Sequence, residues 1–196
     1  MDNKNYQDHF FRKAKSHGFR SRSAFKLIEL NEKFKFLKNS IKVLDIGSFP
    51  GGWCQVINEK IKNVKILGVD KKKIQEIKGV DFVQGDFLEE DCKSKIDQYF
   101  NSNIDVILSD MASETTGNKS LDCIRTNQLC LDTIEFSSKK LNKEGVVVSK
   151  FFMGEESEEV KKIGKKYFKK INFFKPSSSR SESRETYIHC RGLNTL

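Results

Sequence analysis

Short apolar runs alternate along this chain with longer stretches of helical periodicity, and this alternation restricts the fold more than any other feature. Strands arranged in this way form a mostly parallel sheet with helices on both faces. We therefore expect an α/β fold with about seven strands, the last two joined by a long polar loop. The expected strands are residues 41–46, 64–69, 81–84, 104–108, 146–152, 170–174 and 185–190.

Helices are expected where apolar residues recur every three or four positions. The first begins near Ser21 or Ser23, and the later ones cover residues 53–61, 119–141 and 155–168. The last of them carries a run of lysines that we interpret as a solvated helix face. These lysines are Lys161, Lys162, Lys165 and Lys166.

The chain has 196 residues and a formal net charge of +9. This length fits one domain that can bury a core without disulfides. We divide the chain into a basic N-terminal extension, residues 1–20, and a single domain, residues 21–196, and we expect a monomer. A basic excess favours a polyanionic partner such as nucleic acid, although lysine enrichment of a solvated surface would give the same composition.

The cysteines and apolar runs exclude several classes of protein. The five cysteines are widely spaced and form no CxxC pair, which indicates a reducing, intracellular compartment. The three histidines do not group with cysteines, so we expect no metal site. No apolar run approaches the roughly 20 residues of a membrane span, and the first residues do not resemble a signal peptide. Cytoplasm, nucleolus and organelle all remain open.

Polar residues follow the expected strands at the points where ligands bind in open α/β sheets. Gly47 opens a glycine-rich turn after the first strand, and Asp70, Asp86 and Asp110 lie at the ends of the next three. Each acid alone fits a turn or helix cap, but together they indicate an adenosine-containing, cationic cofactor. Asp70 would accept ribose hydroxyls and Asp86 an adenine amino group. The dinucleotide pattern G-x-G-x-x-G is absent, which disfavours a nucleotide-dependent oxidoreductase.

Seven motifs, in order over about residues 12–192, resemble the FtsJ/RrmJ-type ribose 2′-O-methyltransferases. Two positions differ from the family pattern: Ser48-Phe49 stands where two alanines are usual, and Ser113 where a proline is usual. The motifs are Arg20–Leu27, Asp45-Ile46-Gly47 with Pro50-Gly51-Gly52-Trp53, Gln84-Gly85-Asp86-Phe87, Ser109-Asp110-Met111-Ala112, Val148-Ser149-Lys150, Lys175–Arg180 and Ser183–Ile188.

The resemblance implies a Rossmann-like, seven-stranded methyltransferase sheet whose last strand is antiparallel, and S-adenosylmethionine as cofactor. It also implies a catalytic tetrad of Lys26, Asp110, Lys150 and Glu185. For Trp53, helix-to-sheet packing is an equal alternative to cofactor contact. The implied cofactor-binding residues are Gly47, Ser48, Pro50, Gly51, Gly52, Trp53, Asp70, Asp86, Phe87 and Asp110.

The tetrad suggests a chemical hypothesis, because a ribose hydroxyl is a poor nucleophile until its proton is removed. A lysine can remove it only when its pKa falls well below about 10. We assign Lys150 as the general base and expect Lys26 to lower its pKa and steer RNA. Asp110 would orient Lys150, and Glu185 would position Lys26 or the ribose.

The arginines and lysines near the tetrad helix and the final loop are expected to form one RNA-binding face. The motifs resemble most closely the family branch that acts on large-subunit ribosomal RNA, with uridine as the expected target. Alternatives are transfer RNA methylation and a non-catalytic RNA-binding assembly factor that keeps the fold. The expected RNA contacts are Arg12, Lys13, Arg20, Arg22, Arg180 and Arg184.

Overall fold

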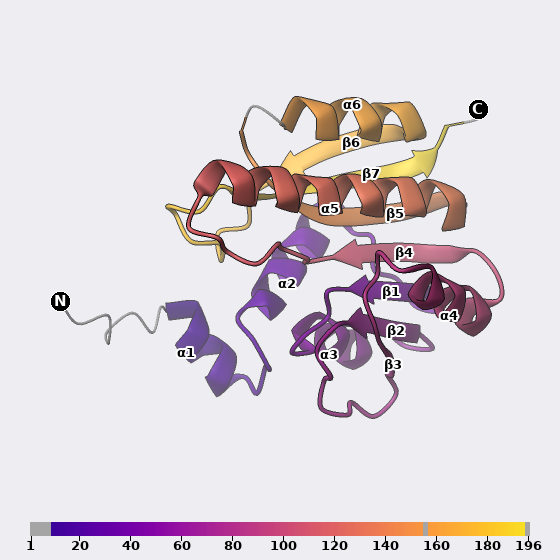
Figure 1. Ribbon diagram of the computed structural model, residues 1–196. Helices are drawn as coiled ribbons and strands as arrows, with labels where there is room; N and C mark the ends of the chain where they lie inside the picture. Colours follow the sequence, from indigo (N-terminus) through magenta and orange to yellow (C-terminus); the bar gives the residue numbers. More distant parts are fainter. Residues whose placement is uncertain (1–8, 155–156, 195–196) are drawn as a thin grey trace.

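The computed structural model describes residues 9–154 and 157–194, and within them the chain forms one sheet flanked by helices (Figure 1). The sheet has seven strands in the order β3-β2-β1-β4-β5-β7-β6. All pairings are parallel except those of β7, which is antiparallel to both neighbours. The predicted α/β fold is confirmed. The strands are β1 (Lys42–Ile46), β2 (Lys65–Asp70), β3 (Asp81–Gln84), β4 (Ile104–Ser109), β5 (Leu141–Phe152), β6 (Phe168–Phe174) and β7 (Glu185–Leu193).

Helices cover both faces of the sheet, as expected. On one face, α2 and α3 bury Leu27, Leu30 and Ile57 against the strands. On the other face, α4, α5 and α6 bury residues such as Ile96 and Ile134. The helices are α1 (His9–Ser16), α2 (Ser23–Phe34), α3 (Gly52–Lys60), α4 (Glu90–Phe100), α5 (Lys119–Lys140) and α6 (Ser157–Tyr167).

Two helices were not expected from the sequence. Helix α4 buries Cys92, Ile96 and Phe100, whose spacing of four residues is a helical signal between polar neighbours. Helix α1 lies in the segment interpreted as a basic extension, and its Phe10 ring contacts Phe25 of α2. Residues 1–8 of that extension lie outside the described residues, as does Glu155, where the last helix was expected to begin.

The strand order brings the chemically important residues to one edge. Parallel strands β1, β2 and β4 end at the same edge, which places Gly47, Asp70 and Asp110 there. Because β7 runs antiparallel to β5, its first residues lie beside the last residues of β5. Glu185 therefore pairs with Phe152, and Tyr187 pairs with Lys150.

Two features are absent from residues 9–154 and 157–194. None of their helices combines the length and apolar character needed to cross a bilayer. In the same residues, no three histidine, cysteine or acidic side chains gather closely enough to hold a metal ion.

Candidate active site

A cavity of about 670 Å³ opens at the carboxyl edge of the sheet. Its volume is within the range of small-molecule sites. Loops after β1, β2, β3 and β4 form its walls, and one side of α5 closes it. Of the residues predicted to bind the cofactor, those that line the cavity are Gly47, Asp70, Asp86, Phe87 and Asp110.

The two acids after β2 and β3 are held in fixed orientations. Asp70 accepts hydrogen bonds from the backbone N–H of Phe49 at 2.9 Å and of Lys72 at 2.8 Å. Asp86 accepts one from the Leu88 N–H at 3.1 Å, and its Oδ2 lies 2.8 Å from Lys71 Nζ. Burial alone would raise the pKa of Asp86, but the hydrogen bond and charge of Lys71 hold it below its ordinary value.

The glycine turn is shaped by close contact with the loop after β4. Gly47 has φ 74°, and a Cβ at this position would lie 2.7 Å from Met111 Cγ and 3.0 Å from the Met111 backbone nitrogen. Any larger residue would therefore displace Met111, which lines the cavity. Glycine at this position keeps the end of β1 close to the cavity wall.

The other predicted cofactor residues lie behind this wall. Ser48, Pro50, Gly51 and Gly52 belong to the turn but do not line the cavity. Trp53 is 2% exposed, and its indole Nε1–H donates to the carbonyl of Ser23 at 2.7 Å. The indole thus joins α3 to α2, and its ring lies 5.9 Å from that of Tyr187 in β7, so it packs toward the sheet as well.

The predicted tetrad comes together as two buried ion pairs. Lys26 Nζ lies 2.7 Å from Glu185 Oε1 and 2.8 Å from Oε2. Lys150 Nζ lies 3.1 Å from Asp110 Oδ1 and donates to the Asp110 carbonyl at 2.5 Å. The two lysines are 9% and 7% exposed. These four residues come from α2, the end of β4, β5 and β7.

Tyr187 connects the two ion pairs, and the sequence did not predict this role. Its hydroxyl donates to Asp110 Oδ1 at 2.6 Å and lies 3.4 Å from Glu185 Oε1. The side chain is fully buried. The sequence did contain an indication of this role. Tyr187 follows Glu185 by two positions, and side chains at that spacing in a strand point to the same face.

The pKa of Asp110 depends on its neighbours in this network. Burial alone would raise its pKa, but the charges of Lys150 and Lys26 and the Tyr187 hydrogen bond hold it below its ordinary value. Burial, together with the charges of Asp110 and Glu185, raises the pKa of Tyr187 well above its usual range. Asp110 is therefore a carboxylate and Tyr187 a neutral hydrogen-bond donor at neutral pH.

The loop between β6 and β7 is fastened to α2 beside the tetrad. Glu29 accepts hydrogen bonds from the backbone N–H groups of Ser177 and Ser178 at 2.6 and 3.0 Å. Arg22 donates to the Ser178 carbonyl. Ser179 Oγ donates to Glu185 Oε1 at 2.7 Å, so the loop contacts the tetrad directly.

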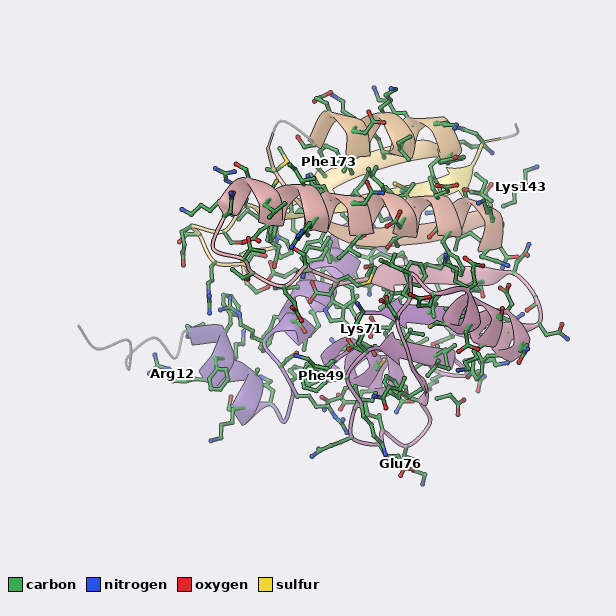
Figure 2. All side chains as sticks on the ribbon, in the orientation of Figure 1. Arg12, Phe49, Lys71, Glu76, Lys143 and Phe173 are labelled. Atoms are coloured by element: carbon green, nitrogen blue, oxygen red, sulfur yellow. The ribbon has the colours of Figure 1, made fainter. Side chains whose placement is uncertain are left out.

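The arginines predicted to contact RNA fall into two groups. Arg12, Arg180 and Arg184 are exposed, and Figure 2 shows Arg12 on the outer side of α1. Arg20, in contrast, donates to the carbonyls of Gln75 and Glu76, each at 2.7 Å.

The remaining predicted RNA contacts also have partners within the protein. Lys13 Nζ lies 5.0 Å from the centre of the Phe25 ring. Burial and then the charge of Arg180 lower the pKa of Arg22, so these two arginines lie close together. The segment before α2 and the loop between β6 and β7 therefore meet beside the tetrad, although they are far apart in the sequence.

Helix α5 supplies cavity residues that the sequence analysis missed. Arg125, Gln128, Leu129 and Asp132 line the cavity, and their spacing places them on one side of the helix. In the sequence, the polar residues of this set form a stripe along one side of the helix. Such a stripe looks the same as an ordinary solvated face. Only the position of α5 across the strand ends identifies it as part of the site.

Comparisons with known proteins agree with this arrangement. The sequence model of the FtsJ-like methyltransferases matches residues 19–193. The ribosomal RNA large subunit methyltransferase E of Pelagibacter ubique is 44% identical over 191 residues, covering 97% of this chain and 94% of the relative. The protein of the same name from Rickettsia rickettsii is 44% identical over 187 residues, covering 92% and 82%.

Solved structures give the same result at the level of the fold. A crystal structure from Plasmodium falciparum, described as a ribosomal RNA methyltransferase, has a TM-score of 0.81 and 36% identity, and covers 89% of this chain and 98% of that one. A Streptococcus mutans protein crystallised with SAH has a TM-score of 0.56 and 14% identity, and covers 85% and 97%. At that identity the likeness concerns the fold alone.

Proposed function

Since the chain belongs to the FtsJ-like methyltransferase family, which confirms the resemblance drawn from its motifs, we propose that it methylates a ribose 2′-hydroxyl of large-subunit ribosomal RNA. The methyl donor is S-adenosylmethionine, and the expected target is a uridine. Support for ribosomal RNA comes from the names of relatives that align over most of the chain. The single observation that carries the ribose assignment is the convergence of Lys26, Asp110, Lys150 and Glu185 beside the cavity.

The cavity fits this cofactor on two grounds. Gly47 lines it, and a Cβ there would clash with Met111, so glycine keeps the end of β1 and the loop after β4 together at the cavity wall. Acidic side chains outnumber basic ones among its charged lining residues, and one of them is Asp110 of the tetrad, which suits a cationic group. Asp70 would hold the ribose and Asp86 the adenine amino group. Bound there, S-adenosylmethionine supplies a methyl group on a positively charged sulfur.

The tetrad would remove the proton of the acceptor hydroxyl. Lys150 is assigned as the proton acceptor, with Asp110 and the Asp110 carbonyl fixing the direction of its amino group. To act in this way the Lys150 amine must offer a free electron pair when the hydroxyl loses its proton. Lys26, held by both oxygens of Glu185, adds a second positive charge that attracts RNA.

The test replaces Lys150 with alanine and measures methyl transfer to ribosomal RNA at saturating S-adenosylmethionine. We expect turnover to fall at least about 100-fold, the lower range for removal of a general base. Digestion of the product RNA and mass spectrometry would locate the methyl group on the ribose or on a base. Lys166→Ala, an exposed lysine on α6, is the matched control. Near-normal turnover of Lys150→Ala, or methylation of a base, would contradict the proposal.

A further inference from the structure

A second, smaller hollow of about 340 Å³ lies beside the cofactor cavity. Its lining combines an aromatic ring with two cationic side chains and, unlike that of the larger cavity, includes no acidic side chain. Phe49 belongs to both, so its ring forms the partition between them. The hollow is lined by Arg20, Phe49, Pro50, Lys73 and Gln75.

Phe49 is unusually exposed for a phenylalanine. Its side chain is 49% exposed, although the adjacent Ser48 and Gly51 are buried. Its backbone N–H is held by Asp70 at 2.9 Å, and the Gly51 N–H donates to the Ser48 carbonyl across the turn. When a ligand binds to an exposed ring on a fixed backbone, the protein loses little conformational entropy.

Lys72 covers one face of the Phe49 ring and leaves the other face open to a ligand. Lys72 Nζ lies over the ring, 5.5 Å from its centre, and Lys72 lines the cofactor cavity but not the hollow. The cation therefore covers the ring from the cofactor side. Lys73 and Arg20 line the hollow with Phe49, and the guanidinium of Arg20 is engaged by backbone carbonyls.

From these contacts we propose that the hollow binds one nucleobase of the RNA substrate, stacked on Phe49, with the adjacent phosphate near Lys73. The proposal rests on the proposed function, since it names a subsite for the same RNA. A flat aromatic ring beside cations is the arrangement by which proteins hold single-stranded RNA without reading its sequence. A purely apolar partner would leave the charge of Lys73 uncompensated.

The position of the hollow relative to the tetrad supports this assignment. Arg20 lines the hollow, and Arg22 is close enough to Glu185 for the two charges to interact. Two residues span at most about 7 Å of backbone. The segment that lines the hollow thus leads directly to the residues beside the tetrad, which suits a subsite for a nucleotide near the methylated one.

The experiment measures two affinities for each variant of the full chain. One is the affinity for S-adenosylhomocysteine, and the other is the affinity for a short single-stranded RNA of mixed sequence at saturating S-adenosylhomocysteine. We expect Phe49→Ala to weaken RNA binding roughly 5- to 100-fold, the range for loss of one stacked base, and more than it weakens S-adenosylhomocysteine binding. Phe49→Trp should restore RNA affinity, and RNA should quench the fluorescence of this tryptophan.

Two further variants sharpen the result. Lys73→Gln should lower the slope of RNA affinity against salt by about 0.7, the contribution of one phosphate contact. Phe173→Ala, which removes another exposed phenylalanine on β6 (37% exposed, Figure 2), should leave RNA binding unchanged.

The outcomes separate this proposal from the proposed function. Unchanged RNA affinity in Phe49→Ala would overturn the stacking site, even if the wild-type protein methylates ribose. A loss confined to S-adenosylhomocysteine would overturn it as well and assign Phe49 to the cofactor. Failure of the wild-type protein to methylate ribose would instead contradict the proposed function.

Discussion

The hydroxyl of Tyr187 lies within hydrogen-bond distance of both Asp110 and Glu185 and so connects the two ion pairs. Removing it in Tyr187→Phe keeps the buried ring and deletes the hydrogen bond to Asp110. A hydrogen bond to a charged group contributes about 1.5–3 kcal/mol. We expect kcat to fall about tenfold with little change in the KM for RNA, as for a positioning residue that holds Asp110 and Lys150 in place.

A pH profile distinguishes positioning from a loss of folding. Tyr187 helps to keep the pKa of Asp110 low, so the acid limb of kcat in Tyr187→Phe should move to higher pH. Tyr167→Phe, at the end of α6, is the control. A profile of unchanged shape with uniformly lower activity would contradict the role assigned to Tyr187.

Single residues differ in how far the sequence could identify them. Asp70, Asp86 and Asp110 were predictable, because parallel strands end at one edge and ligands bind there. Tyr187 was not singled out, because a tyrosine inside an apolar strand fits core packing equally well. For Trp53 the sequence left cofactor contact and packing equally open, and in the structure its indole is buried and hydrogen-bonded to α2. Burial and hydrogen-bond partners, which decide such cases, depend on elements that are distant in the sequence.

At the scale of elements, Arg20 connects the segment before α2 to the loop after β2. Its guanidinium donates to the carbonyls of Gln75 and Glu76, and its backbone N–H donates to Gln55 of α3. This loop begins at Asp70 and carries Lys71 and Lys72 into the cofactor cavity. Arg20 therefore stabilises one wall of the cavity from outside.

We expect Arg20→Ala to weaken S-adenosylhomocysteine binding about three- to tenfold, because the loop loses hydrogen bonds from a charged donor. Faster amide exchange in residues 71–80 should accompany this loss. Arg184→Ala, an exposed arginine of the final loop, should leave the exchange unchanged. If Arg20→Ala reduced only the salt dependence of RNA binding, Arg20 would be a phosphate contact, as the sequence analysis predicted, rather than a loop anchor.

Helices and strands were predictable from the sequence where apolar residues recur regularly over a long stretch. The seven strands and helices α2, α3, α5 and α6 follow the expected order. Helix α4 was missed because its three buried residues are separated by charged ones, and α1 because it is short and basic. Strand β5 begins at Leu141 rather than at residue 146, and its pairing with β4 shifts register between Ile104 and Val106. Such an irregularity depends on the neighbouring strand and has no local signal.

For the whole molecule, stability across pH depends on two buried groups on the side of the sheet that carries α2 and α3. His189 of β7 is 5% exposed, stacks on Phe34 at 4.2 Å, and has no hydrogen-bond partner for either ring nitrogen within the described residues. Burial, assisted by the charge of Arg191, lowers its pKa to about 4. Asp45 of β1 is fully buried, and burial raises its pKa to about 7 despite a hydrogen bond from Cys54.

These two shifts act on stability in opposite directions. Between about pH 4 and 6.5 the unfolded chain binds more protons at His189 than the folded one, so this group makes stability rise with pH. Between about pH 4 and 7 the folded chain binds more protons at Asp45, so this group makes stability fall with pH. In the wild-type protein their contributions largely cancel.

Substituting either group should reveal the pH dependence of stability that the other group causes. In His189→Phe, which can keep the stack on Phe34, we expect the free energy of unfolding to fall by roughly 2 kcal/mol between pH 5 and pH 7 relative to wild type. In Asp45→Asn, which keeps an acceptor for Cys54, it should rise by a similar amount. Urea unfolding at both pH values measures the difference, and the double variant should return to the nearly flat wild-type profile. If the single variants had parallel pH profiles, neither buried group would control stability in this range.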